Sequence, residues 1–180
     1  MPDKYQDKYR IPSARLKGYD YGQNGAYFIT ICTKNRIHYF GEIEESRNDP
    51  FLQMSPMGIV AYDYWQKIPE HFPFVFLDEY VLMPNHIHGI VIISKSNQQQ
   101  QIDYFNKFGP QSGNLSSIIR GYKAGVKTFA TTNKIEFLWQ PRFYDRIIRD
   151  EDEMKRIRRY IISNPANWDK DRNNKPDLFM

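Results

Sequence analysis

The chain has 180 residues, of which 41% are hydrophobic and 16% aromatic, and its formal net charge at pH 7 is +4. This length is enough for one domain with a full core and too short for two ordinary domains, and the composition excludes an intrinsically disordered chain. The single cysteine, Cys32, cannot form an internal disulfide, and no apolar run is long enough to span a membrane, so we expect a cytoplasmic protein.

The first part of the chain contains a strand pattern, a turn and a helix start. Residues 26–33, AYFITICT, are β-branched and aromatic and follow an Asn-Gly turn signal, which predicts a strand. The polar segment at 48–50 predicts a loop or a hairpin tip. A Ser-Pro pair at 55–56 predicts the start of a helix that ends near residue 68, because serine caps helices and proline suits their first turn.

Two further strands are predicted in the middle of the chain. FVFLDEYVLM at 74–83 and HIHGIVIIS at 86–94 are largely apolar runs separated by a Pro-Asn pair, which predicts antiparallel neighbours joined by a tight turn. The next residues, 95–113, contain a run of glutamines and two glycines and predict a mobile loop.

The last part of the chain predicts a helix, a strand and a second helix. Residues 114–132 have apolar side chains at helical spacing after an asparagine that can act as N-cap. Residues 137–148 have an interrupted strand pattern. Residues 150–163 begin with acidic side chains, which favour a helix N-terminus, and they end before Pro165.

The order of these elements predicts the fold class. It is strand, helix, two strands, helix, strand, helix, which is typical of an α+β, ferredoxin-like (split βαβ) antiparallel sheet with helices on one face and one appended C-terminal helix. We expect a single domain over residues 1–180, with a basic N-terminal arm at 1–22 and a C-terminal tail at 165–180.

Two of the four histidines, His86 and His88, are separated by one residue within a predicted strand. Alternate side chains of a strand project to the same face, so the two imidazoles are predicted to lie side by side, with Ile90 and Ile92 continuing their row into the core. Three interpretations fit this arrangement: a metal site, a proton-transfer pair, or two buried histidines with ordinary partners.

The ligand types in the chain narrow the metal interpretation. Two imidazoles form half of a site for a divalent ion, which a third ligand with an oxygen atom would complete. A structural zinc site needs further ligands such as cysteines, and the His-x-Glu deaminase and His-Glu-x-x-His protease motifs are absent. The remaining metal interpretation is an open site in which the ion acts as a Lewis acid on a phosphoryl group.

The predicted last helix carries a tyrosine between two polar residues. Arg156, Tyr160 and Asn164 are spaced by four and lie along one stripe of the helix. Such a stripe presents a phenol toward a site, or it packs the tyrosine at an interface. Tyr122 and Tyr144 are the competing candidates for a nucleophile, but neither has an amide side chain four residues later.

Positive charge is concentrated in the N-terminal arm, at 120–127 and at 155–160. Clustered cations are the footprint of a surface that binds phosphates, although each cluster alone is also compatible with a solvated helix face. The residues expected to contact nucleic-acid phosphates are Arg15, Lys17, Arg120, Lys123, Lys127 and Arg156.

Longer phrases of the sequence resemble the REP-associated tyrosine transposases, an IS200-like family of HUH single-tyrosine transposases. The resemblance is carried between residues 15 and 165 by RLKGYDY, GAYFITICT, VLMPNHIHGIV, WQPRFYDRIIRDE and RIRRYIISNP. It implies Mg²⁺ or Mn²⁺ held by His86, His88 and Asn164, with Tyr160, His86 and His88 as the catalytic residues. It also implies a substrate of single-stranded DNA beside a REP-like hairpin, cleaved and rejoined through a 5′-phosphotyrosine intermediate.

Two other functions are compatible with these residues. One is a non-catalytic, domesticated protein that binds nucleic-acid hairpins, although binding alone would not require the full set of two histidines, tyrosine and asparagine. The other is a replication-initiator or relaxase-type nickase, which shares the histidine pair and the tyrosine chemistry. The sequence leaves open a homodimer and the question of whether Tyr160 serves its own subunit's histidines or those of a partner.

Overall fold

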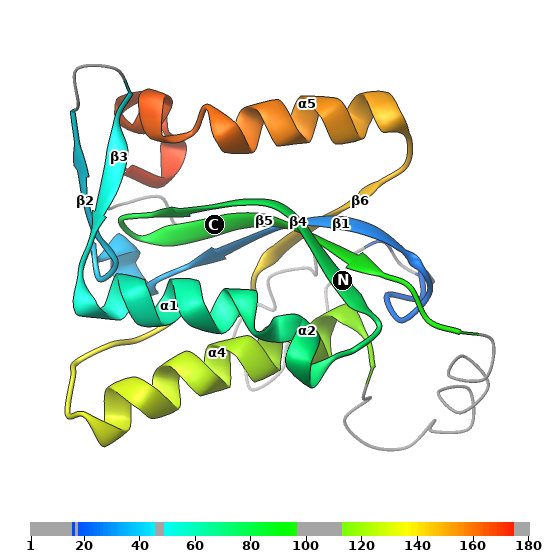
Figure 1. Ribbon diagram of the computed structural model, residues 1–180, viewed down its shortest axis with the longest axis horizontal. Helices are drawn as coiled ribbons and strands as arrows, with labels where there is room; N and C mark the ends of the chain where they lie inside the picture. The colour runs from blue at the N-terminus through cyan, green and yellow to red at the C-terminus, as the bar shows by residue number, and fades with distance from the viewer. Residues whose placement is uncertain (1–15, 17, 46–48, 97–112, 175–180) are drawn as a thin grey trace, which may run out of the picture.

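The centre of the protein is a four-stranded antiparallel sheet with the strand order β4-β5-β1-β6. The structure is a computed structural model that describes residues 16, 18–45, 49–96 and 113–174 (Figure 1). The strands of this sheet are β1 (Gly25–Cys32), β4 (Val75–Met83), β5 (His86–Ile93) and β6 (Tyr144–Ile148). Because β5 is an inner strand, main-chain hydrogen bonds hold it on both sides.

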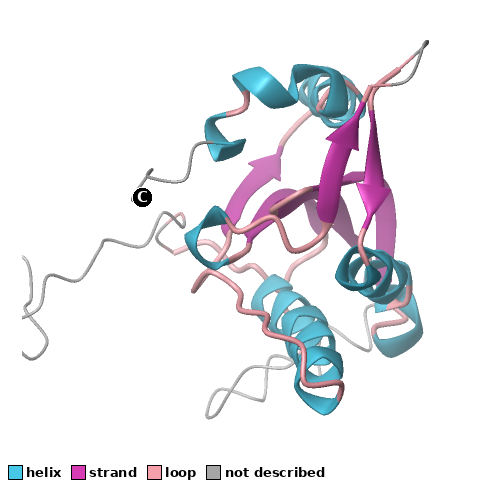
Figure 2. Ribbon diagram, turned by 90° about the vertical axis from the view of Figure 1, so that its left-hand side faces the viewer, coloured by secondary structure: helices cyan, strands magenta, loops and turns pink. Residues whose placement is uncertain are grey.

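Helices lie on both faces of the sheet (Figures 1 and 2). On one face are α1 (Pro56–Gln66), α2 (Ile68–His71) and α4 (Leu115–Thr132), and on the other is α5 (Glu151–Ile162). A separate hairpin at one end of the sheet consists of β2 (Gly41–Glu44) and β3 (Phe51–Met54). The short 3₁₀ helices are η1 (Lys34–Arg36), η2 (Pro165–Lys170) and η3 (Arg172–Asn174).

Side-chain caps fix the starts of the three long helices. Ser55 Oγ accepts a hydrogen bond from a main-chain N–H in the first turn of α1 at 3.0 Å. Asn114 and Ser117 form a reciprocal capping box at the start of α4, and Asp150 Oδ1 accepts from the main-chain N–H of Glu153 in α5 at 2.7 Å. These bonds satisfy main-chain donors that have no partner within the helix, so the predicted helix starts are confirmed.

The sheet divides the apolar side chains into a large and a small core. The large core lies between the sheet and α1, α2 and α4, and fully buried Tyr27, Ile29 and Trp65 belong to it. The small core lies under α5 and contains Phe28, Ile90, Ile148 and Ile161. Alternation along β5 places Ile87 and Val91 in the large core, while His86 and His88 face the side of the small core.

The predicted α+β, ferredoxin-like fold is confirmed, and the appended C-terminal helix, whose face the sequence did not predict, lies opposite α1, α2 and α4. Of the loop or hairpin tip predicted at 48–50, residues 49 and 50 directly precede β3 and residue 48 lies outside the described residues. The interrupted strand at 137–148 consists of a bridge between Thr33 and Trp139 followed by β6. In the part of the chain that the structure describes, no helix has the length and apolar character needed to cross a bilayer.

Three predicted segments lie wholly or partly outside the described residues. Arg15 and Lys17 of the N-terminal arm are among those not described, as are most of the loop predicted at 95–113 and residues 175–180 of the predicted tail. Residues 165–174, which the sequence assigns to a tail, instead form η2 and η3 against the end of the sheet, because Trp168 is buried and supplies an apolar anchor.

The glycine that follows His88 is required by close packing with a tryptophan. A Cβ atom built on Gly89 would lie 2.5 Å from Cζ2 of Trp65, whose side chain is fully buried in the large core. The indole ring therefore occupies the space that a side chain at this position would need, and it presses against the strand that carries both histidines.

We predict that Gly89→Ala lowers the free energy of unfolding by about 1–3 kcal/mol, the usual effect of overpacking a core. Denaturant titration followed by tryptophan fluorescence measures this change. Gly121→Ala is the matched control, because a Cβ there would lie at an ordinary 3.4 Å from the ring of Phe72. Equal stabilities of wild type and Gly89→Ala would contradict the packing argument.

Candidate metal and tyrosine site

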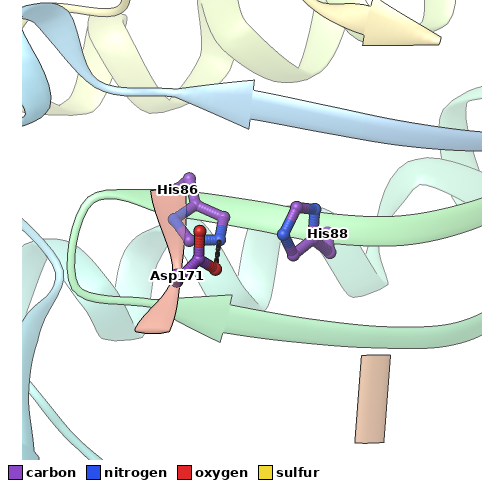
Figure 3. Close-up of side chains that lie close together, drawn as sticks. All are labelled: His86, His88 and Asp171. Carbon is purple, nitrogen blue, oxygen red and sulfur yellow. Dashed lines mark ion pairs between the residues drawn. The ribbon is translucent and has the colours of Figure 1, made fainter. Parts of the chain in front are cut away.

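The two histidines of β5 project from the same face of the sheet and lie next to each other (Figure 3). Their ring centroids are 4.4 Å apart, and the relative exposures of His86 and His88 are 0% and 2%. The same-face arrangement predicted from the period of a strand is therefore present.

The tautomer of His86 is determined by the side chain of Asn85. The amide nitrogen of Asn85 donates to the main-chain carbonyls of Arg36 at 3.0 Å and Asn173 at 2.9 Å, which fixes the orientation of the amide. Its oxygen, an acceptor, then lies 2.9 Å from Nδ1 of His86. Nδ1 therefore carries a proton that it donates to Asn85, and Nε2 is the nitrogen that faces the site.

His88 is held in a similar way on the neighbouring strand. Its Nδ1 lies 2.8 Å from the hydroxyl of Thr30, which is buried on β1 directly opposite. The ring of Phe28 stacks on this imidazole with centroids 5.4 Å apart. Partners at Nδ1 orient an imidazole so that Nε2 is available to a ligand, as in metal-binding histidines.

Helix α5 places Tyr160 at the histidine pair. The phenolic oxygen lies 3.1 Å from Nε2 of His88, and the two rings meet edge to face at 5.2 Å. Tyr160 is 45% exposed, so a large substrate can reach it. The stripe of the helix left open whether this phenol faces a site or packs at an interface, and the family resemblance implied that it acts with the two histidines.

The competing tyrosines are placed differently. Tyr122 is buried in the large core, where its hydroxyl donates to the main-chain carbonyl of Ala61 at 3.0 Å and burial raises its pKa. It lies on the sheet face opposite the histidines. Tyr144 lies on β6 on the same face as the histidines, directly opposite Thr30, and it is 37% exposed.

A carboxylate that the sequence analysis missed completes a cluster with the histidines. Oδ2 of Asp171 lies 3.7 Å from Nε2 of His86, and one ligand atom from each of His86, His88 and Asp171 lies within 4.8 Å of the other two. Asp171 follows η2, and its Oδ1 accepts from the main-chain N–H of Asn173 at 2.7 Å. A single aspartate in a polar segment belongs to no periodic pattern in the sequence, so its position beside the histidines could not be predicted and is known only from the fold.

Asn164, the ligand that the resemblance implies, is buried at the end of α5. Its Oδ1 accepts no hydrogen bond from any residue that the structure describes. A buried amide oxygen without a donor is costly and is available to a cation. The imidazole nitrogens and the carboxylate of the cluster suit a divalent cation, so these residues fit the metal that the resemblance implies.

Two arginine–carboxylate pairs attach α5 to the two edge strands of the sheet. Arg158 makes two 2.7 Å hydrogen bonds to Asp78 of β4, and Arg146 of β6 donates from Nε to Glu153 at 2.7 Å. The bonds from Arg158 lower the pKa of Asp78. The pKa of Glu153 is lowered by the main-chain N–H of Arg149 and by Arg146. The helix that carries the tyrosine is thus anchored at both edges.

The basic residues expected to bind phosphates are divided between the two faces. Lys123 and Lys127 of α4 donate to main-chain carbonyls within residues 137–142 at 2.7–2.9 Å, and burial lowers the pKa of Lys123 to about 8. These bonds hold the segment after α4, on the face opposite the histidines. Arg120 is exposed on α4, and Arg156 is exposed on α5, one turn before the tyrosine.

Comparisons with known proteins give a relative and a shared fold. No family model matches the chain. An uncharacterized protein of Haemophilus influenzae is 40% identical over 168 residues, which cover 88% of this chain and 90% of that protein. A solved structure of a REP-associated tyrosine transposase bound to a REP hairpin matches with a TM-score of 0.56 and 18% identity, over 88% of this chain and 74% of that one.

We predict that Asp171→Asn lowers the affinity for Mn²⁺ at least about tenfold, because loss of even an outer partner of a metal ligand usually weakens binding by that much. Titration calorimetry measures the affinity, and Asn164→Ala in the same titration tests the predicted amide ligand. The control is Asp169→Asn, which removes an exposed carboxylate two residues away. An unchanged affinity in Asp171→Asn would exclude this carboxylate from the site.

Proposed function

The chain belongs to the same family as the Haemophilus influenzae protein and has the fold of the HUH-type REP-associated tyrosine transposases, and we propose that it cleaves and rejoins single-stranded DNA beside hairpins. The observation that carries this proposal is the 3.1 Å contact between the phenol of Tyr160 and Nε2 of His88, next to His86. An exposed potential nucleophile therefore meets two buried metal-type ligands at one place on the sheet.

The proposed reaction is an exchange of phosphate esters. The phenolic oxygen of Tyr160 forms a bond to the scissile phosphorus, and the bond from phosphorus to the 3′ oxygen breaks. The phenol loses its proton and the leaving 3′ oxygen gains one, so the charge of the phosphodiester is unchanged. The product is a 5′-phosphotyrosine, and attack by a 3′-hydroxyl reverses the step without an external energy source.

We propose that His86 and His88 hold Mg²⁺ or Mn²⁺ through their Nε2 atoms, with Asp171 and Asn164 as the oxygen ligands. When bound, such a cation supplies positive charge to the oxygens of the scissile phosphate. Asn85 and Thr30 contribute by orienting the imidazoles, since each contacts an Nδ1 atom.

Helix α5 contributes by holding the nucleophile in position. Its small core and its two arginine–carboxylate pairs restrict the position of Tyr160 over the sheet. Positioning of reacting groups is a major part of catalysis in phosphoryl transfer, because it removes the entropy cost of bringing them together. Arg156, one turn before Tyr160, is our candidate for contacts with substrate phosphates near the site, while Arg120 would contact DNA only on the opposite face.

A hairpin-binding protein without catalytic activity is the alternative from another class. It would not need a phenol within hydrogen-bonding distance of a histidine, nor a carboxylate beside the pair. A replication-initiator or relaxase-type nickase would use the same chemistry, and it differs in the DNA that it cleaves. Hairpin oligonucleotides and linear oligonucleotides of the same flanking sequence distinguish these two enzymes.

We predict that Tyr160→Phe abolishes covalent adduct formation with single-stranded hairpin oligonucleotides in Mn²⁺, because only the nucleophilic oxygen is removed. Denaturing gels with 3′- and 5′-labelled DNA measure the adduct, and a 5′-phosphotyrosine carries only the 3′ label. Tyr144→Phe is the matched control, since it removes the hydroxyl of another exposed tyrosine on the same face. An adduct in Tyr160→Phe, or one that carries the 5′ label, would refute the assignment.

A further inference from the structure

An ion pair joins each flank of α5 to the sheet. On the β4 side it is the two-bond pair of Arg158 and Asp78, and on the β6 side it is the pair of Arg146 and Glu153, two turns before Tyr160. Helical spacing places Arg156 and Tyr160 on the flank toward β6, and both are exposed. This flank therefore presents a cation and the phenol to a DNA strand.

The side chains on the β6 side form one row across the sheet with the histidine site. Main-chain pairing places His88 of β5 opposite Thr30 of β1, and Thr30 opposite Tyr144 of β6. Neighbouring strands are about 4.8 Å apart, so Tyr144 lies about two strand spacings, or roughly 10 Å, from His88 along this row. Its side chain points to the same face as the histidine.

Tyr144 extends an aromatic surface that begins at the histidine. The ring of Phe28 stacks on His88 and meets both Tyr160 and Tyr144 edge to face, with centroid distances of 6.0 and 6.4 Å. Phe28 is 8% exposed and forms the floor, whereas Tyr144 is 37% exposed and stands at the open edge. Next to it on the same face, the side chain of Arg146 is 58% exposed while bonded to Glu153.

We propose that Tyr144 is a binding residue for the substrate strand, and that its ring stacks on an unpaired nucleobase adjacent to the scissile phosphate. The proposal rests on the proposed function, because it assumes that single-stranded DNA reaches Tyr160. Aromatic side chains beside a basic surface bind single strands in this way, since every base has a π face that can stack. Arg156 is exposed one turn before Tyr160, and the partly exposed Arg146 lies two residues after Tyr144, so both add positive charge near the proposed path of the backbone.

The test measures binding without cleavage. Wild type, Tyr144→Ala, Tyr144→Leu, Tyr144→Phe and Phe76→Ala are titrated against a fluorescein-labelled hairpin oligonucleotide with a mixed-sequence single-stranded flank, in EDTA, by fluorescence anisotropy. Phe76 is the matched control because it is a 56% exposed aromatic residue on the same sheet face, at the opposite edge in β4. Tyr144→Leu retains an apolar contact with Phe28, and circular dichroism verifies the fold of each variant.

We expect the Kd to rise about tenfold in Tyr144→Ala and Tyr144→Leu, within the range for loss of one base stack. Tyr144→Phe should bind like wild type because it keeps the aromatic ring. Phe76→Ala should also bind like wild type because residue 76 lies at the opposite edge of the sheet. A second set of oligonucleotides has one flank nucleotide at a time replaced by an abasic site. At one position, the abasic site should raise the Kd of the wild-type protein about tenfold. At that same position, it should cause no further rise in the Kd of Tyr144→Ala.

Two results would overturn stacking by Tyr144. The first is an unchanged Kd in both Tyr144→Ala and Tyr144→Leu, when both are folded. The second is that, at every position of the flank, the loss of affinity caused by the abasic site adds to the loss caused by Tyr144→Ala. Adduct formation by wild type in Mn²⁺ is measured in parallel. If no adduct forms, the proposed function fails while the binding comparison still decides the role of Tyr144. If the adduct forms and the Kd is unchanged, only the stacking proposal fails.

Discussion

The hydrogen bonds of one buried asparagine organise the end of the sheet where the candidate site lies. Asn85, fully buried between β4 and β5, bonds through its side chain to Arg36, His86 and Asn173. Its main-chain carbonyl accepts from both the N–H and the hydroxyl of Thr33, at 2.8 and 3.0 Å. These contacts join the strand turn, η1 and η3, and they determine which nitrogen of His86 faces the site. Replacement of this residue would leave several buried polar groups without partners, which is more costly than the loss of one bond.

The two faces of the sheet have different physical roles. The large core under α1 and α4 supplies most of the buried apolar surface and fixes β5, partly through the contact between Gly89 and Trp65. The face under α5 has a small core and contains the polar side chains of the site. Polar groups can be kept there because each histidine has a partner at Nδ1.

The attachment of α5 depends on charge as well as on apolar contact. The pKa values of Asp78 and Glu153 are both lowered in the folded protein. A lowered carboxyl pKa contributes stability above the ordinary value of about 4, and this contribution is lost as the pH falls through the lower folded value. The position of the tyrosine helix is therefore more sensitive to acid than the large core, which is held by apolar packing.

Patterns within single elements made much of this arrangement predictable. The period of a strand predicted that His86 and His88 share a face. The spacing by four put Tyr160 and Asn164 on one predicted stripe, although α5 ends at Ile162 and Asn164 directly precedes η2. The order of the elements predicted the sheet topology, but not the position of α5 over the histidine strand. Contacts between elements distant in sequence were not predictable. Asp171 lies between η2 and η3, and the fold of this segment brings it to the histidines. The sequence predicts only a tail after the last helix, so this contact was not expected.

The same limit explains the basic residues of α4. Helical spacing put Lys123 and Lys127 on one stripe, and charge alone favoured phosphate contacts. The fold brings a returning segment alongside the helix, and its main-chain carbonyls accept hydrogen bonds from both ammonium groups. The tertiary partners of a lysine depend on which segment returns beside it, and no local pattern encodes that.

Through Asn85, the end of the sheet holds His86 with a proton on Nδ1 and with Nε2 directed to the site. A long-range ¹H–¹⁵N correlation spectrum of the histidine side chains, recorded on ¹⁵N-labelled protein near neutral pH, measures this tautomer directly. We predict a protonated Nδ1 for His86, with Asn85→Leu as the variant in which this preference is lost. A pyridine-type Nδ1, with the only ring proton on Nε2, in the wild-type protein would contradict this prediction, because Nδ1 could not then donate to Asn85.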